Sequence, residues 1–339
     1  MTPTVSIIIP CYNERRTIGQ VLEAIRRQTH PLRDLEVLVA DGMSNDGTRQ
    51  VIADYARAHP DLSVRIVDNP ARSIPAALNR AIEHSHGQVI IRIDAHALPY
   101  PDYVERCLET LNRTDAANVG GVWEIHAGGQ GWRARAIAAA AGHPLGAGDA
   151  RYRTRGQAGP ADTVPFGAFR RQWLERVGGF DETLLTNEDY ELNARLRRAG
   201  GIIWLDPRIR SIYYARSGLG ALARQYFRYG FWKSRMLVRN VDTLRWRQAL
   251  PPLFVAAGLG LALLGAAWHP AWALLGVQLG AYASVSFLVG AVEAYRRREV
   301  GLAVGFPLAI WTMHSSWGSG FLWGLLTWAV GGRHDRRHP

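Results

Sequence analysis

The first hundred residues alternate short apolar runs with amphipathic segments, and this alternation restricts the fold more than any other feature of the sequence. The segments between the runs carry apolar side chains at helical spacing, and the runs are short enough to be buried strands. The runs are residues 5–9, 35–40, 64–67 and 89–93. Strands that alternate with helices predict an α/β fold with a parallel sheet and helices on its faces. Because ligands bind such sheets at the carboxyl ends of the strands, the residues after each run are candidates for a site.

Polar side chains follow three of these runs. Glu14 comes after the first run, Asp41 ends the second, and Asp94 and His96 follow the fourth. The period-2 geometry of a strand would place Asp94 and His96 on the same side of the chain. A carboxylate oxygen and a neutral imidazole nitrogen can together hold a divalent cation, with diphosphate oxygens at the open positions. The alternative for His96 is an ordinary strand-end histidine with satisfied hydrogen bonds.

The charge balance indicates an anionic partner. The chain holds 40 Lys and Arg against 29 Asp and Glu in 339 residues, and its pI is about 10.1. A phosphate-bearing substrate and an anionic membrane surface both fit this balance. We expect no nucleic acid partner, because acids and bases are interspersed through the α/β part. Cys11 and Cys107 are too few for a disulfide framework or a zinc-ligand pattern and are expected to be ordinary thiols.

Beyond residue 217 the sequence becomes aromatic and basic, and then strongly apolar. Residues 218–239 mix aromatic with basic side chains, which is typical of an amphipathic helix in a membrane interface. Three apolar segments follow, each long enough to cross a hydrocarbon core of about 30 Å. They are residues 250–268, 271–292 and 304–330.

Arginines predict the orientation of these segments. Those at positions 245 and 247, and the run 296–298, place both flanks of the first two segments in the cytosol. Three full spans, the arrangement that we expect, leave the arginines of the tail outside, whereas a re-entrant third segment keeps them in the cytosol. The predicted domains are an α/β catalytic domain over 1–217, an interfacial region over 218–248, a transmembrane region of about three segments over 249–331 and a basic tail over 332–339.

Three motifs in chain order resemble those of the inverting family-2 glycosyltransferases of the GT-A fold. They are Ile-Ile-Ile-Pro-Cys-Tyr-Asn-Glu at 7–14, Ala-Asp-Gly-Met-Ser-Asn-Asp-Gly-Thr at 40–48 and Asp-Ala-His at 94–96. The resemblance covers about residues 4–235 and is greatest to the membrane-associated bacterial exopolysaccharide, or succinoglycan-type, subgroup. It implies a GT-A nucleotide-sugar-binding domain with a Rossmann-like, mostly parallel sheet, followed by an interfacial helix and transmembrane helices.

The resemblance also implies roles for residues at the strand ends. Pro10, Tyr12 and Glu14 would line a nucleoside pocket, and Asp41 would accept a hydrogen bond from the base. Asp94 would bind the donor and, with His96, a Mn²⁺ or Mg²⁺ ion. The family pattern is usually Asp-x-Asp, so His96 in the second place favours Mn²⁺ and leaves the ion bound mainly through substrate phosphates.

Two further positions are candidates for the chemistry. Arg72 stands in a loop before a helix, where its guanidinium can pair with diphosphate oxygens, although a solvated loop charge is equally consistent. Glu188 and Asp189 begin a predicted helix, where acids are favourable with the helix dipole without any catalytic role. In the family this Glu-Asp pair supplies the general base, and Asp189 is the matching residue. A base is needed because an acceptor hydroxyl is a poor nucleophile until its proton is removed.

Residues 225–229 resemble the Gln-x-x-Arg-Trp signature of processive polysaccharide synthases. Gln225 and Arg228 match it, but Tyr229 stands in the Trp position, which leaves processivity open. These three residues are candidates for acceptor binding, with Tyr229 stacking on a sugar. Residues 120–165 have a weaker pattern, and we expect a small helix and a mobile loop there rather than core.

The sequence therefore predicts a membrane-anchored inverting glycosyltransferase. It would move a sugar from a nucleotide-diphosphate donor, such as a UDP-sugar, to a lipid-linked saccharide during exopolysaccharide or envelope glycan synthesis. We expect a multi-pass protein of the inner (plasma) membrane whose catalytic domain lies in the cytosol. The alternatives are direct transfer to a polyprenyl phosphate and a non-catalytic sugar-nucleotide sensor.

Overall fold

The computed structural model describes residues 4–154, 156–239 and 245–331, and the chain divides into two compact units. The sheet unit consists of Met1–Glu124 and Arg151–Tyr213, and the helical unit of Ile125–Ala150 and Tyr214–Pro339. The predicted first domain, 1–217, therefore includes a segment that belongs to the helical unit. The predicted basic tail, 332–339, lies outside the described residues.

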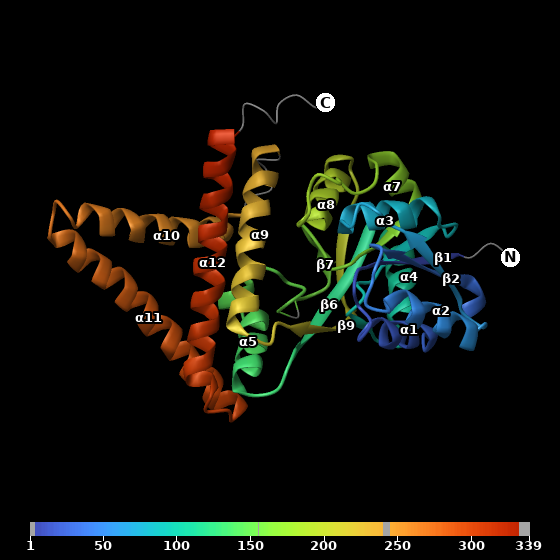
Figure 1. The fold of residues 1–339 in the computed structure, drawn as a ribbon, viewed down its shortest axis with the longest axis horizontal. Helices are drawn as coiled ribbons and strands as arrows, with labels where there is room; N and C mark the ends of the chain where they lie inside the picture. The colour runs from blue at the N-terminus through green and yellow to red at the C-terminus, as the bar shows by residue number, and fades with distance from the viewer. Residues whose placement is uncertain (1–3, 155, 240–244, 332–339) are drawn as a thin grey trace. The chain divides into compact units, whose positions relative to one another are not determined.

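The sheet unit is an α/β domain with one mixed sheet, visible in Figure 1. Its strands are β1 (Val5–Cys11), β2 (Leu35–Asp41), β3 (Ser63–Asp68), β4 (Val89–Arg92), β5 (Leu98–Pro99), β6 (Asn118–Ala127), β7 (Gly159–Pro160), β8 (Ala168–Arg170) and β9 (Ile203–Ala215). Their order is β3-β2-β1-β4-β8-β6-β9-β5, with β7 paired to β9. The pairs among β3, β2, β1 and β4 are parallel, as the sequence predicts, whereas β8 pairs antiparallel with both β4 and β6. The sheet is thus parallel in the half formed by β3, β2, β1 and β4 and antiparallel beyond it.

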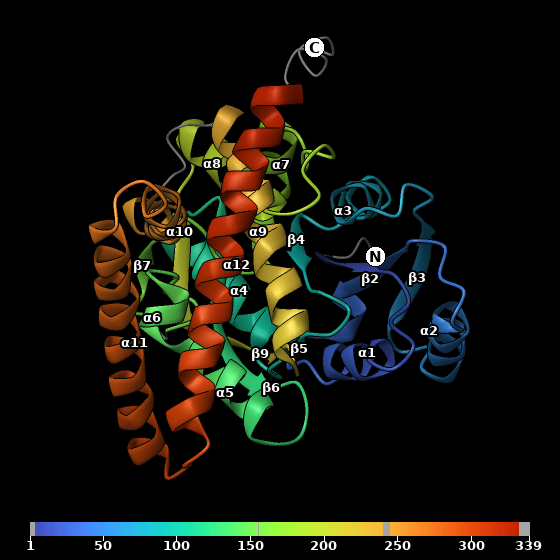
Figure 2. The same cartoon turned by 60° about the vertical axis from the view of Figure 1, so that its left-hand side comes forward.

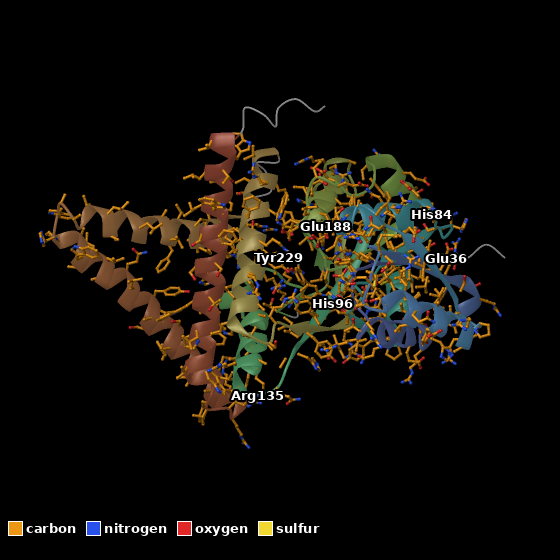
Figure 3. All side chains as sticks on the ribbon, viewed as in Figure 1. Glu36, His84, His96, Arg135, Glu188 and Tyr229 are labelled. Carbon is orange, nitrogen blue, oxygen red and sulfur yellow. The ribbon has the colours of Figure 1, made fainter. Side chains whose placement is uncertain are left out.

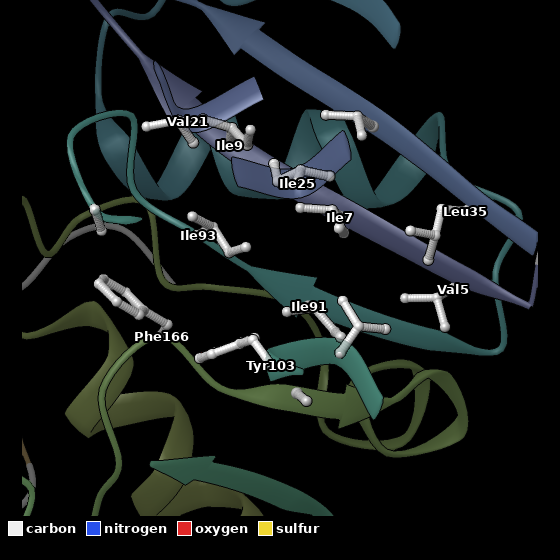
Figure 4. Close-up of a cluster of buried hydrophobic side chains, with 14 of the residues drawn as sticks. Val5, Ile7, Ile9, Val21, Ile25, Leu35, Ile91, Ile93, Tyr103 and Phe166 are labelled. Atoms are coloured by element: carbon white, nitrogen blue, oxygen red, sulfur yellow. The ribbon is translucent and has the colours of Figure 1, made fainter. Parts of the chain in front are cut away.

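Helices cover both faces of this sheet. They are α1 (Ile18–Arg26), a 3₁₀ turn η1 (Leu32–Asp34), α2 (Thr48–Ala58), α3 (Ile74–Glu83), α4 (Tyr103–Thr114), α7 (Arg171–Val177) and α8 (Glu188–Arg198). All seven residues of β1 are buried, and alternate side chains enter different cores. Ile7 and Ile9 pack with side chains of α1 and α4 in the cluster of Figure 4, and Ile8 packs with those of α3 and α8. This two-sided burial explains why the first run reads as continuously apolar.

The helical unit holds α5 (Trp132–Gly142), α6 (Pro144–Ala147), α9 (Leu219–Arg239), α10 (Trp246–Leu264), α11 (Pro270–Arg297) and α12 (Leu302–Gly331). Helices α9 and α12 lie side by side in Figures 1 and 2. A Cβ on Gly230 of α9 would lie 2.0 Å from the carbonyl oxygen of Trp317, and one on Gly320 of α12 would lie 2.1 Å from that of Phe227. The glycines therefore allow the two backbones to touch.

The expectation of a small helix within residues 120–165 is confirmed by α5, but the expectation that this part of the chain is not core is wrong for that helix. Ala136, Ile137 and Ala140 are buried, and α5 packs against α12. Alanine permits this close approach but gives little apolar periodicity, so the sequence shows no clear amphipathic pattern there.

Helices α10 and α11 are long and apolar enough to cross a membrane, over Arg247–Leu264 and Pro270–Arg297. Few of their residues are buried within the chain, and large apolar side chains such as Leu263 and Val277 are exposed. In the described part of the chain these are the two helices that reach that combination of length and hydropathy. The predicted third segment forms α12, which is longer but richer in Gly, Ser and Trp.

Candidate active site

Asp41 ends β2 and is completely buried at the carboxyl edge of the sheet. Its Oδ1 accepts a hydrogen bond from the Ser44 hydroxyl at 2.5 Å, and its Oδ2 accepts from the Ser44 amide at 2.9 Å. Arg49 also donates to Oδ2 at 3.0 Å and extends to Asp68, at the end of β3, at 2.8 Å. Those two acids are register partners in the parallel pair, so one guanidinium can join both strand ends. The hydrogen bond to Asp68 raises the pKa of Arg49.

The loop after β3 brings Arg72 beside Tyr12. The Arg72 guanidinium lies 5.9 Å from the centroid of the Tyr12 ring, which is 47% exposed. Asn69 shapes this loop, because its amide N–H donates to the Asp41 carbonyl at 2.8 Å and its Nδ2 donates to the Ser73 carbonyl at 3.0 Å. The fold therefore gathers the predicted nucleotide-binding residues at one edge of the sheet.

Glu14 and His96 form a pair that the sequence did not predict. Nδ1 of His96 lies 3.1 Å from Oε1 of Glu14, and the Thr17 hydroxyl donates to Oε2 at 2.6 Å. Burial alone would raise the pKa of Glu14, but the hydrogen bonds from His96 and Thr17 outweigh it and lower the pKa. Glu14 thus orients the imidazole, and any direct role toward a nucleoside stays a prediction.

The geometric argument for Asp94 and His96 is wrong, although both residues lie at the predicted edge. Strand β4 ends at Arg92, and the Ala97 amide donates to the Asp94 carbonyl at 3.0 Å, which closes a turn over residues 94–97. Side chains two apart in a turn do not share a face as they do in a strand. Their joint binding of a metal ion stays a prediction.

Arg92, the last residue of β4, connects Asp94 to helix α8. Its Nε donates to Asp94 Oδ1 at 3.0 Å, and its Nη1 donates to Glu188 Oε1 at 2.9 Å. Arg92 is 6% exposed and Glu188 5%, so this ion pair is buried. Burial raises the pKa of Glu188 and outweighs the opposing effect of Arg92, while the Asp189 charge adds to the increase.

The two acids that begin α8 differ in environment. Glu188 is buried and paired, whereas Asp189 is half-buried and its Oδ1 accepts a hydrogen bond from the Tyr190 amide at 2.8 Å. Asn187 precedes them in the left-handed conformation (φ 68°), so the chain turns sharply into the helix. Figure 3 shows Glu188 at this helix start and His96 in the same sheet unit. Of the predicted pair, Asp189 is the one whose side chain is partly exposed, and its role as a base stays a prediction.

Contacts between distant parts of the sequence hold α8 in place. Asn79 of α3 accepts from the Phe180 amide at 2.7 Å and donates to its carbonyl at 2.9 Å. Arg195 of α8 pairs with Glu191 and donates to the carbonyl of Val177 at 2.7 Å. These contacts fix both the helix and the turn that leads to it.

Part of the chain that carries this site matches a known protein family. A family model described as "Glycosyl transferase family 2" matches residues 6–178. The chain belongs to glycosyl transferase family 2. The match covers every strand end described above and stops just before α8.

Curated relatives of this family-2 glycosyltransferase extend over nearly its whole length. The "Succinoglycan biosynthesis protein ExoA" of Rhizobium meliloti (strain 1021) is 33% identical over 317 residues, which is 93% of each chain. A Methanococcus voltae protein, "Dolichyl N-acetyl-alpha-D-glucosaminyl phosphate 3-beta-D-2,3-diacetamido-2,3-dideoxy-beta-D-glucuronosyltransferase", is 26% identical over 95% of this chain and 97% of its own. Both the family and the succinoglycan-type resemblance are thereby confirmed.

A solved structure confirms the GT-A fold. The mannosyltransferase PcManGT from Pyrobaculum calidifontis, in complex with GDP-Man and Mn²⁺, superposes with a TM-score of 0.65 at 23% identity. The alignment covers 96% of this chain and 88% of that one. The agreement concerns the fold.

The metal donors of the family-2 enzyme are few. Among residues 4–154, 156–239 and 245–331, no group of three or more His, Cys, Asp or Glu side chains is placed to hold a metal ion. Asp94 offers one carboxylate, of which Arg92 occupies Oδ1, and His96 offers an imidazole. This donor set fits a divalent ion only if substrate phosphates supply most of its ligands.

The predicted acceptor residues lie on α9 of the helical unit. Gln225 Nε2 donates to the Tyr229 hydroxyl at 2.9 Å, as expected for residues four apart on a helix, and Arg228 is exposed. Figure 3 shows Tyr229 on this helix. Their role toward an acceptor stays a prediction.

Sequence reasoning missed Arg49 and Arg92. Arg49 stands eight residues after Asp41, in the first turn of α2, and this spacing lets its long side chain reach back to the end of β2. The local sequence therefore contained a signal from which the Arg49–Asp41 contact could have been predicted. Arg92 lies within an apolar run, where a buried charge requires partners, but nothing in the local sequence identified Glu188 as one.

Proposed function

We propose that this family-2 enzyme transfers a sugar from a nucleotide-diphosphate sugar to a lipid-linked saccharide, with inversion at the anomeric carbon. The observation that carries the proposal is the division between the two acids of α8. Glu188 is committed to Arg92, whereas Asp189 remains half-buried with one oxygen bonded to its own helix. A partly exposed carboxylate at the carboxyl edge of a nucleotide-binding sheet is suited to general-base chemistry.

The proposed reaction is a single displacement. The acceptor oxygen forms a bond to the anomeric carbon as Asp189 takes the hydroxyl proton. The bond between that carbon and the diphosphate oxygen breaks on the opposite face, and its electron pair leaves with the nucleotide diphosphate. Arg72, which lies beside Tyr12, would bind the diphosphate through its guanidinium. A divalent ion held by Asp94 and His96 would neutralise charge on the departing diphosphate.

The lipid-linked acceptor is proposed on two grounds. Helices α10 and α11 have the length and apolar exposure of membrane-crossing segments, and a similar protein carries a dolichyl phosphate-linked sugar in its name. A cytosolic position for the catalytic part, at the inner membrane, is supported by the arginines at 245 and 247 and at 296–298, which flank this helix pair.

The third apolar segment forms one continuous helix over Leu302–Gly331, so it does not turn back as the re-entrant alternative requires. For this segment we favour an interfacial position over a third span. Helix α12 packs along the basic, amphipathic α9 with touching backbones and also contacts α5. Arg135 of α5 pairs with Glu299, just before α12 begins, at 2.7 Å. These neighbours bury side chains of α12 such as Phe306, Ile310 and Met313, so less of its surface is left to face lipid than on α10 and α11. A reporter fused after residue 339 that reads as periplasmic would restore the three-span prediction.

Nucleotide release tests the proposed reaction. Purified protein in detergent is incubated with UDP-, GDP- and dTDP-sugars and a lipid extract, with Mn²⁺ or EDTA, and wild type is compared with Asp189→Asn. Metal-dependent release that the variant loses supports base-catalysed transfer and names the donor. Asp115→Asn, an exposed acid of the same unit, is the matched control.

Other outcomes contradict the proposal in distinct ways. Release that persists in Asp189→Asn indicates a phosphate acceptor, which is already ionised and needs no base. Donor binding without turnover, even with lipid extract present, indicates a sensor.

A further inference from the structure

The feature that the proposed mechanism leaves unused is the buried guanidinium of Arg92. It contacts two carboxylates that lie far apart in the sequence, Asp94 at 3.0 Å and Glu188 at 2.9 Å. A buried cation between two acids is costly to desolvate and persists only where its hydrogen bonds are well formed. The preceding residues of β4, Ile90 and Ile91, are apolar and fully buried, so the charge of Arg92 differs from the packing of the rest of its strand.

The backbone that presents Arg92 is fixed on both sides. Arg92 is the register partner of Ile8 on β1, and its amide donates to the carbonyl of Gly167 at 3.0 Å. Gly167 adopts φ 97°, and a Cβ there would lie 2.7 Å from both the Asn118 Oδ1 and the Phe169 ring. Neighbouring backbone thus holds the strand end on both sides, and the conformation of the side chain sets where the guanidinium lies.

The opposite end of the contact lies at the start of α8. Glu188 begins the helix and Asp189 follows it directly, so a hydrogen bond to the Glu188 carboxylate restrains the turn that carries Asp189. Two acids, Asp94 and Glu188, thus share one cation, and Asp189 follows Glu188 directly in the chain.

We propose that Arg92 is a positioning residue that couples Asp94 on the donor side to Glu188, and so holds Asp189 in its working position. The inference rests on the proposed function only in taking Asp189 as the base. The planar guanidinium donates hydrogen bonds from Nε and Nη1 in two fixed directions, one to each carboxylate. The ammonium of a lysine is a point charge and cannot reproduce both hydrogen bonds with this geometry. Arg92 also keeps like charges at the two ends from repelling each other.

A double-mutant cycle tests this coupling. Arg92→Lys, Glu188→Gln and the double variant are compared with wild type for kcat, donor KM, donor binding and the thermal unfolding midpoint. We expect each single change to lower kcat about 10- to 100-fold, because a misplaced catalytic group costs about that much, with donor affinity changed less than about 3-fold. The double variant should lose no more than the worse single variant, since either change breaks the same connection.

Arg113→Lys is the matched control. Arg113 on α4 also pairs with a buried acid of the sheet unit, Asp206 on β9, at 2.9 Å. This pair is not part of the candidate site. Its kcat should be unchanged. An unfolding midpoint for Arg92→Lys close to that of Arg113→Lys shows that the loss of kcat is not a loss of folded protein.

Two outcomes would overturn the inference. Losses that multiply in the double variant show that Arg92 and Glu188 act independently. A weakened donor affinity with kcat preserved shows that Arg92 belongs to donor binding instead. Both differ from failure of the proposed function, which appears as full turnover in Asp189→Asn.

Discussion

The two ends of the candidate site are built differently, although both lie at the edge of the same sheet. At the donor end, Ser44 and Arg49 hold Asp41 within a span of eight residues. At the base end, Arg92 reaches a carboxylate that is 96 residues further along the chain. The donor end is therefore determined largely by its own loop, whereas the base end exists only when the whole sheet unit has folded.

This difference suggests that the two ends fail differently. Loss of a local contact at the donor end should weaken nucleotide binding while the rest of the site survives. Loss of a long-range contact at the base end should displace Asp189, the proposed base, while the donor still binds. The predictions below separate kcat from donor affinity for that reason.

The largest effect is expected at the base itself. Asp189→Asn should lower kcat about 10²- to 10⁴-fold, the contribution usual for a general base, and should leave the donor dissociation constant nearly unchanged. Steady-state kinetics with calorimetric donor titration would check this. If Asp189→Asn instead lowers donor affinity, the expectation that the two ends separately control kcat and donor binding is contradicted.

The complementary change at the donor end is Arg49→Gln. It leaves the fully buried Asp41 without its cation, so donor affinity should fall about tenfold and the free energy of unfolding should fall by about 1 kcal/mol. The stability loss is modest because Arg49 itself is 38% exposed. It corresponds to a midpoint shift of about 2–4 °C for a unit of this size. A loss of kcat larger than the loss of affinity would contradict the comparison.

A smaller effect is expected from the contact that fixes the turn before α8. Asn79→Ala removes both hydrogen bonds to the Phe180 backbone, so we expect kcat to fall about 3- to 10-fold with donor affinity preserved. Asn112→Ala, an exposed change on α4, is the control. Equal kinetics in the two variants would show that the turn needs no such support.

The same contrast explains what could be predicted from the sequence. Asp41 and Glu14 were located because a strand end and its own loop are close in sequence, and the parallel half of the sheet followed from the same alternation. The pairing of Arg92 with Glu188 was not predictable, because it depends on β8 lying antiparallel beside β4, which brings the α8 region to the Asp94 edge. Helix α5 was misjudged because its alanines have no apolar face of their own until α12 covers them.

The smallest effect on activity is expected far from both ends, at Glu36. This acid lies on β2 in Figure 3 and is 5% exposed in its side chain. It accepts from the Ser6 hydroxyl at 2.6 Å and from Arg65 at 2.7 Å, and the backbone and imidazole of His86 face it as well. Burial would raise the pKa of Glu36, but these hydrogen bonds outweigh it and lower the pKa.

The sign of the pH effect follows from that direction. A carboxyl whose pKa is lower in the folded than in the unfolded state stabilises the fold above its unfolded pKa of about 4.3. That stability is lost as the pH falls through the folded pKa. Glu36→Gln should therefore be less stable than wild type by about 1 kcal/mol at pH 7, and the difference should shrink below about pH 4, with kcat at pH 7 unchanged. Thermal unfolding from pH 3 to 8 beside Glu83→Gln, an exposed acid on α3, would check this, and a difference that grows on acidification would reverse the sign assigned to Glu36.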